Sequence, residues 1–85
     1  MQVTIPSPLL SYTGRREVRA DGATVDAVLR DLDRQFPGLR FRMVDEQDRL
    51  RLHMRLFVGQ QELHDLATPL DDAATLHIIQ ALSGG

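Results

Sequence analysis

The residues whose chemistry stands out are Gly84 and Gly85, the last two of the sequence. Glycine has no Cβ, so a tail that ends in two glycines can enter a narrow channel and adopt dihedrals closed to other residues. The reactive group at the end of such a tail is the α-carboxylate of Gly85. Because its negative charge repels nucleophiles, this carboxylate must receive a leaving group before it can react. Taken alone, the two glycines also fit a frayed chain end or an expression remnant.

Other kinds of reactive site find little support. The sequence has no cysteine, which excludes disulfides, thiolate metal sites and cysteine nucleophiles. His53, His64 and His77 lie too far apart in the sequence to match a metal-ligand pattern. His77 is interpreted as a strand residue, since the sequence places no serine or acid beside it. We therefore expect a protein that is not an enzyme, with no catalytic residue of its own, no metal and no bound cofactor.

Size and charge narrow the function further. The 85 residues and 9.6 kDa fit one small domain, and 42% hydrophobic with 26% charged residues exclude wholesale disorder. The net charge of −2 disfavours nucleic-acid binding. No apolar run approaches the ~20 residues needed to span a membrane, and the N-terminus does not resemble a signal peptide, so we expect a cytoplasmic protein. All ten basic residues are arginine, which rules out polymeric chains linked through internal lysines.

In the first half of the chain, local signals predict a hairpin and a helix. Strands are expected over 2–5 and 15–20, joined by a long loop. Thr24 is a good helix N-cap, and Pro37-Gly38 should stop the helix. Asp26 and Arg30 should pair on its exposed side. The apolar stripe consists of Val25, Val28, Leu29, Leu32 and Phe36.

The second half supplies the remaining strands. Residues 39–52 fit either a short helical turn or an extended arm. Strands are expected over 54–58, 62–63 and 75–82. The order predicts an α+β protein, a β-grasp fold with a mixed sheet of about five strands and one main helix on one face. The domain should span 1–81, with 82–85 as a flexible tail.

Three groups of side chains are candidates for binding. Phe57, His77 and Ile79 should share the uncovered face of the sheet and form a docking patch, unless the arm at 39–52 covers them. A basic stretch is interpreted as a solvated arm, although it could serve an anionic site. Asp65, Asp71 and Asp72 could help a partner grip the protein near its tail, or could simply form turns. The basic stretch comprises Arg40, Arg42, Arg49, Arg51 and Arg55.

The sequence resembles a known family. Residues 55–61, 75–79 and the terminal Gly84-Gly85 resemble the C-terminal half of ubiquitin, and the whole chain is more similar to the prokaryotic ubiquitin-like sulfur carriers of the MoaD/ThiS type. The resemblance rests on Val3-Thr4-Ile5-Pro6, Gly22-Ala23-Thr24-Val25, Phe36-Pro37-Gly38, Arg49-Leu50-Arg51 and Ala81-Leu82-Ser83-Gly84-Gly85. One turn departs from the family pattern, because Asp71-Asp72-Ala73-Ala74 replaces an acidic, glycine-containing turn.

The resemblance implies a function. A ubiquitin-activating-like adenylyltransferase of the MoeB/ThiF type would use ATP and Mg²⁺ to adenylate Gly85, and sulfur would then displace AMP to give a thiocarboxylate. A downstream enzyme, such as a molybdopterin synthase large subunit, would consume the sulfur for molybdopterin, thiamine, cysteine or thiolated-tRNA synthesis. The resemblance also strengthens the docking interpretation of Phe57, His77 and Ile79. Leu82 and Ser83, in the tail, are expected to contact the partner as well. The alternatives are a protein modifier that forms isopeptide bonds and a non-covalent adaptor.

Overall fold

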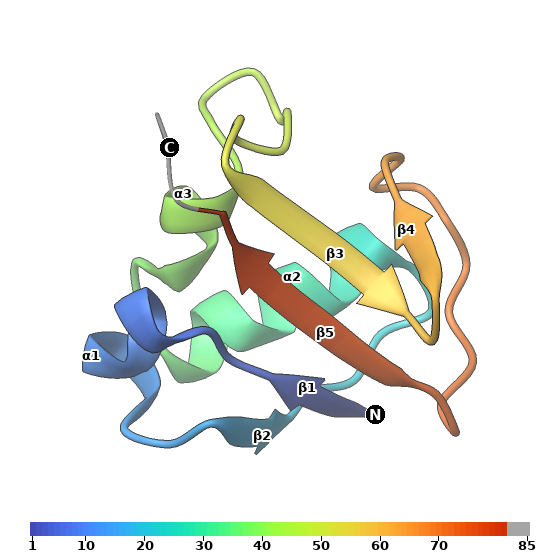
Figure 1. The fold of residues 1–85 in the computed structure, drawn as a ribbon, viewed down its shortest axis with the longest axis horizontal. Coiled ribbons are helices and arrows are strands. Elements are labelled where there is room, and N and C mark those ends of the chain that lie inside the picture. Colours follow the sequence, from blue (N-terminus) through green and yellow to red (C-terminus); the bar gives the residue numbers. More distant parts are fainter. Residues whose placement is uncertain (82–85) are drawn as a thin grey trace.

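Within residues 1–81, which the computed structural model describes, five strands form one mixed sheet with the longest helix packed across one face (Figure 1). The strands lie in the order β2-β1-β5-β3-β4. β1 and β5 run parallel, whereas the other neighbours are antiparallel. This is the predicted β-grasp fold. The strands are β1 (Gln2–Thr4), β2 (Glu17–Arg19), β3 (Met54–Val58), β4 (Gln61–Leu63) and β5 (Thr75–Gln80).

The first two strands form the predicted hairpin, but their connection is not an irregular loop. β1 pairs with β2 from Gln2 opposite Arg19 to Thr4 opposite Glu17. Between them lie a 3₁₀ turn, η1 (Ser7–Leu9), and a one-turn helix, α1 (Leu10–Thr13). The prolines that end β1 also start this turn, because proline is tolerated in the first turn of a helix.

The main helix, α2 (Val25–Gln35), follows the prediction closely. The Thr24 hydroxyl accepts a hydrogen bond from Ala27 N at 3.2 Å, as expected of an N-cap. Asp26 and Arg30 pair at 2.7 Å. The helix ends before Gly38, whose φ of 93° favours glycine. Of the predicted apolar stripe, Val25, Val28, Leu29 and Leu32 are fully buried, whereas Phe36 follows the last residue of the helix and is half-buried against the core.

The segment 39–52, called the arm below, contains both a helix and a braced loop. Helix α3 (Leu39–Met43) packs beside α2, with Leu39 and Met43 buried. The loop that follows is closed by a bridge between Val44 and Leu50. Inside it, Asp45 Oδ1 accepts hydrogen bonds from two backbone N–H groups, at 2.8 and 3.0 Å. The arm is therefore a folded element.

The core lies between the sheet and α2. Met54 and Leu56 of β3 and Leu76 and Ile78 of β5 point into it, as the period-2 alternation of these strands requires. β5 ends at Gln80, short of the predicted end at residue 82, which lies outside the described residues. Among residues 1–81, no helix is long and apolar enough to cross a membrane.

Candidate functional site

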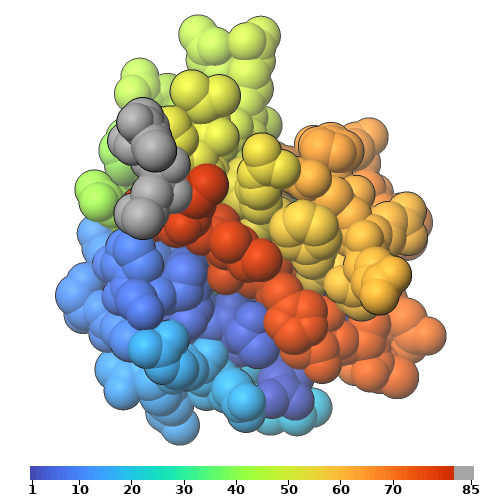
Figure 2. Space-filling model, viewed as in Figure 1, coloured from blue at the N-terminus to red at the C-terminus, as the bar shows by residue number. Residues whose placement is uncertain are grey.

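The face of the sheet opposite α2 carries the residues predicted to form a docking patch. In the pairing of β3 with β5, Phe57 lies opposite His77 and Arg55 lies opposite Ile79. Directly opposite side chains share one face of an antiparallel pair. Figure 2 shows this face, with β3 in yellow and β5 in orange-red running side by side across it. The structure therefore brings Phe57, His77 and Ile79 together.

The arm does not cover this patch. It lies at one end of the sheet, where α3 packs against α2 (Figure 1). Ile79 is 44% exposed, while Phe57 and His77 are half-buried between neighbouring side chains. The face is thus an open, partly apolar surface built on two rigid strands.

His77 is held by a hydrogen bond across the sheet. Its Nδ1 lies 2.9 Å from Thr4 Oγ1, and Thr4 is its register partner on β1. Among residues 1–81, Thr4 is the only side chain that hydrogen-bonds the imidazole, so there is no carboxylate to orient it as a catalytic base. The geometry supports the interpretation of His77 as a fixed part of the open face.

The chain leaves β5 beside the arm. The backbone N–H of Ala81 donates to the carbonyl of His53 at 2.7 Å. This hydrogen bond holds the last described residue of the chain next to the end of the arm. The remaining predicted site residues, Leu82, Ser83, Gly84 and Gly85, lie outside the described residues.

Arg40 corrects the prediction that the basic stretch is a solvated arm. Only 16% of its side chain is exposed, and its Nη2 donates to Asp26 at 2.7 Å and to Asp48 at 3.2 Å. Partial burial opposes ionisation of Asp26, but hydrogen bonds from Arg30 and Arg40 outweigh it and hold the pKa of Asp26 below its usual value. Desolvation also opposes the charge of Arg40, but its hydrogen bonds to Asp26 and Asp48 outweigh this effect and raise the pKa of Arg40. Arg40 therefore ties the arm to α2.

The other four arginines lie nearer the surface, as predicted, but two of them make specific contacts. Arg55 pairs with Glu62 on β4 at 3.4 Å. Arg51 Nε donates to the carbonyl of Phe41 at 2.7 Å, and its guanidinium lies 4.6 Å from the centroid of the Phe41 ring. These contacts hold the arm and the β3–β4 hairpin in shape.

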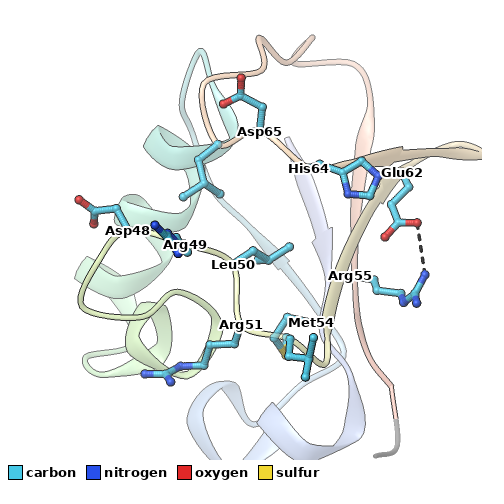
Figure 3. A pocket seen from close by; sticks show the side chains of 11 residues that line it. Asp48, Arg49, Leu50, Arg51, Met54, Arg55, Glu62, His64 and Asp65 are labelled. Atoms are coloured by element: carbon cyan, nitrogen blue, oxygen red, sulfur yellow. Dashed lines mark hydrogen bonds and ion pairs between the residues drawn. The ribbon is translucent and has the colours of Figure 1, made fainter.

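A hollow of about 670 Å³ lies between the arm and β4 (Figure 3). Leu50 points into it from the arm, and Arg51 is turned away towards the other side. Side chains of both charges line it, namely Arg49 and Arg55 beside Asp48, Glu62 and Asp65. Among residues 1–81 there is no group of three or more histidine, aspartate or glutamate side chains that could hold a metal ion. The hollow therefore lacks the convergent charge of an anion or metal site.

Two of the three acidic candidates act as turn formers. Asp65 Oδ1 accepts from Ala67 N and Asp71 Oδ1 accepts from Ala73 N, both at 2.9 Å. Asp71 and Asp72 come just before β5, at the opposite end of that strand from Ala81. Asp71 and Asp72 therefore do not adjoin the point where the chain leaves β5, and their suggested contact with a partner stays a prediction.

Two exposed apolar side chains, Phe41 and Leu52, were not among the candidate binding residues predicted from the sequence. Phe41 is 55% exposed and Leu52 is 88% exposed, and both lie in the arm. The spacing of Leu39 and Met43, four residues apart and both buried, could have shown that Phe41 falls on the outer side of a helical turn.

Comparison with known proteins identifies the family. No model of a known protein family matches the chain. The sulfur carrier protein CysO of Mycobacterium tuberculosis (strain H37Rv) is 32% identical over 89 aligned positions, covering 98% of this chain and 96% of CysO. The crystal structure of an Amycolatopsis orientalis BexX/CysO complex matches with a TM-score of 0.89 and 31% identity, covering 99% of this chain and 98% of that one.

A third match is SAMP1 of Haloferax volcanii, with a TM-score of 0.84 and 25% identity over 100% of this chain and 98% of that one. The fold and these matches together define a ubiquitin-like β-grasp protein of the carrier class. Within that class, the chain belongs to the sulfur carrier family that includes CysO.

Proposed function

We propose that this protein carries sulfur as a thiocarboxylate on the carboxyl carbon of Gly85. The proposal is supported by the 32% identity with CysO, which extends over 98% of the chain. It is also supported by Gly84 and Gly85, which have the small size needed to enter an enzyme channel. The protein is then a substrate for other enzymes and needs no general acid or base of its own.

The chemistry proceeds in two balanced steps on a partner enzyme that supplies ATP and Mg²⁺. A carboxylate oxygen of Gly85 attacks the α-phosphorus of ATP, and pyrophosphate leaves with the electron pair of the broken P–O bond. Hydrosulfide then attacks the carbonyl carbon, the C–O bond to AMP breaks, and a proton is released to leave the thiocarboxylate. If a persulfide is the donor, the first product is an acyl disulfide, which a thiol must reduce.

The partners are a ubiquitin-activating-like adenylyltransferase of the MoeB/ThiF type and a downstream enzyme that accepts the sulfur. The similarity to carriers named CysO favours an acceptor enzyme of cysteine synthesis. A molybdopterin synthase large subunit is the main alternative acceptor. Phe57, His77 and Ile79 dock on these enzymes through the open face, and Leu82 and Ser83 lead the tail into the active site.

Removal of Gly85 tests the carrier function. The truncated protein should fold normally, because Ile78 is the last buried core residue among residues 1–81. It should nevertheless transfer no sulfur to the acceptor enzyme, measured as product formed per carrier added. Full transfer by a protein that ends at Gly84 would contradict the proposal.

Phe57→Ala tests docking, with Phe57→Leu as a control that keeps an apolar side chain. Loss of the aromatic ring should weaken binding to the activating enzyme about tenfold, since aromatic anchors often contribute more than 1 kcal/mol. An adaptor with an inert tail would also lose binding in Phe57→Ala, but its activity would survive removal of Gly85.

A protein modifier is a second candidate, favoured by the likeness to SAMP1, which is described as a small archaeal modifier protein. Activation would be the same, but a lysine amine on a target protein would displace AMP. The distinguishing observation is a di-glycine remnant on lysines of other proteins after digestion with a protease that cleaves after small residues such as Ser83, because trypsin has no cleavage site beyond Arg55. Its presence would favour the modifier, and its absence together with sulfur transfer would favour the carrier.

A further inference from the structure

A second surface surrounds the point where the chain leaves the sheet. Ala81 is hydrogen-bonded to the carbonyl of His53, directly after the arm. Beside this point a hollow of about 460 Å³ is lined by the arm, by His53 and by Gln80, the last residue of β5. In Figure 1 the end of β5 lies next to α3 and to the loop that precedes β3. The arm residues that line the hollow include Phe41, Arg42, Arg51 and Leu52, together called the exit collar.

The exit collar exposes two large apolar side chains. Among residues 1–81, the large hydrophobic side chains that are exposed are Phe41, Leu52 and Ile79. The first two belong to the collar, and Ile79 lies near the same end of β5. Clusters of exposed apolar groups on small proteins mark interfaces.

The collar is also preorganised. Arg51 donates its Nε to the Phe41 carbonyl and stacks over the Phe41 ring, while its backbone N–H donates to Met43 O at 2.8 Å. The bridge between Val44 and Leu50 closes the loop beneath. A surface that is already ordered loses less conformational entropy when it binds a partner.

Charge indicates the chemistry of that partner. Among residues 1–81, the lining of the 460 Å³ hollow contains Arg42 and Arg51 and no acidic residue, whereas charges of both signs line the hollow on the other side of the arm. Arg42 has no ion-pair partner among the described residues. A complementary surface would therefore be apolar at its centre and acidic at its rim.

Covalent geometry limits how far the activating enzyme can lie from this surface. Residues 82–85 can span at most about 13–14 Å, at roughly 3.3–3.6 Å per residue. An enzyme that adenylates Gly85 must bring its catalytic groups within that distance of Ala81. The mouth of its active-site channel therefore lies near Ala81, and the arm is the element that ends beside this point.

We infer that the exit collar docks on the activating adenylyltransferase, at an apolar site with acidic residues around it. This inference rests on the proposed function and adds a contact separate from the open face of the sheet. The collar acts by positioning the carrier, so it should affect affinity and not the chemical step.

The test is ATP–pyrophosphate exchange catalysed by the activating enzyme from the same source, measured over a range of carrier concentrations. Leu52→Asp should raise the KM for the carrier about tenfold or more with kcat unchanged, because a charge replaces an apolar contact. Arg42→Glu should also raise KM and should weaken its dependence on salt. Leu52 is so exposed that its replacement should leave the unfolding midpoint unchanged.

Two control variants carry the same charge changes away from the collar. Gln61→Asp lies at the exposed start of β4, and Arg15→Glu lies exposed just before β2. Both should keep the wild-type KM. A wild-type KM for Leu52→Asp and Arg42→Glu, or an equal rise in the KM of the controls, would refute docking through the exit collar. Neither result would contradict the carrier function. If the wild-type protein supports no ATP–pyrophosphate exchange by an enzyme shown to form adenylates, both the collar docking and the carrier function are contradicted.

Discussion

Replacing Arg40 by methionine should destabilise the protein, because this side chain joins the arm to α2. Its hydrogen bonds to Asp26 and Asp48 are charge-assisted, and such bonds contribute about 1.5–3 kcal/mol each when shielded from water. Two effects reduce the loss. The carboxylates of Asp26 and Asp48 are 30% and 69% exposed, so water can replace the arginine. The buried Nε of Arg40 has no hydrogen-bond partner within residues 1–81, and methionine removes that penalty of about 1–3 kcal/mol.

The remaining cost is about 1–2 kcal/mol of unfolding free energy. For a domain of this size each kcal/mol lowers Tm by about 4–8 °C. Urea denaturation at pH 7, followed by far-UV circular dichroism, measures this directly. The matched control is Arg30→Met, which removes an exposed i,i+4 pair with Asp26 that is expected to contribute only about 0.3–0.5 kcal/mol. If Arg40→Met costs no more than Arg30→Met, the structural role assigned to Arg40 is wrong.

Three further predictions concern the helix and its surroundings. The folded-state pKa of Asp26 lies below its unfolded value, so its stabilising contribution is complete above about pH 4 and is lost as pH falls through the folded pKa. The stability gap between wild type and Asp26→Asn, from urea midpoints between pH 3 and 7, should narrow as pH falls; a constant gap would contradict this. Thr24→Ala should cost about 1 kcal/mol and Thr24→Ser much less, and equal losses would argue against the cap. Gly22→Ala should lower Tm, because its Cβ would lie 2.6 Å from the backbone nitrogen of Val28; an unchanged Tm would mean that the loop shifts freely.

The parts of the fold that sequence predicted well are those whose signals are local. For α2, the cap at Thr24, the apolar stripe and the stop at Pro37-Gly38 all agree, so no distant contact was needed. Alternation along β3 and β5 was likewise enough to place Phe57, His77 and Ile79 on one face. By contrast, Pro6 and Pro8 mark the end of a strand equally well whether a loop or a 3₁₀ turn follows.

The arm could not be predicted because tertiary contacts determine it. Arg40 looks like any solvated arginine in a charged stretch, and its burial depends on Asp26, which belongs to another element. The exposure of Leu52 depends on the loop that the Val44–Leu50 bridge closes. The prediction for Leu82, Ser83, Gly84 and Gly85 concerns residues beyond those described and stays a prediction.

The most direct test of the carrier function is an intact-mass spectrum. The protein would be incubated with a ubiquitin-activating-like enzyme from the same source, ATP, Mg²⁺ and a sulfur donor. The account predicts a mass gain equal to the replacement of one oxygen by sulfur, and no gain when Gly85 is removed. An unchanged mass, with an activating enzyme shown to be competent on another carrier, would contradict it.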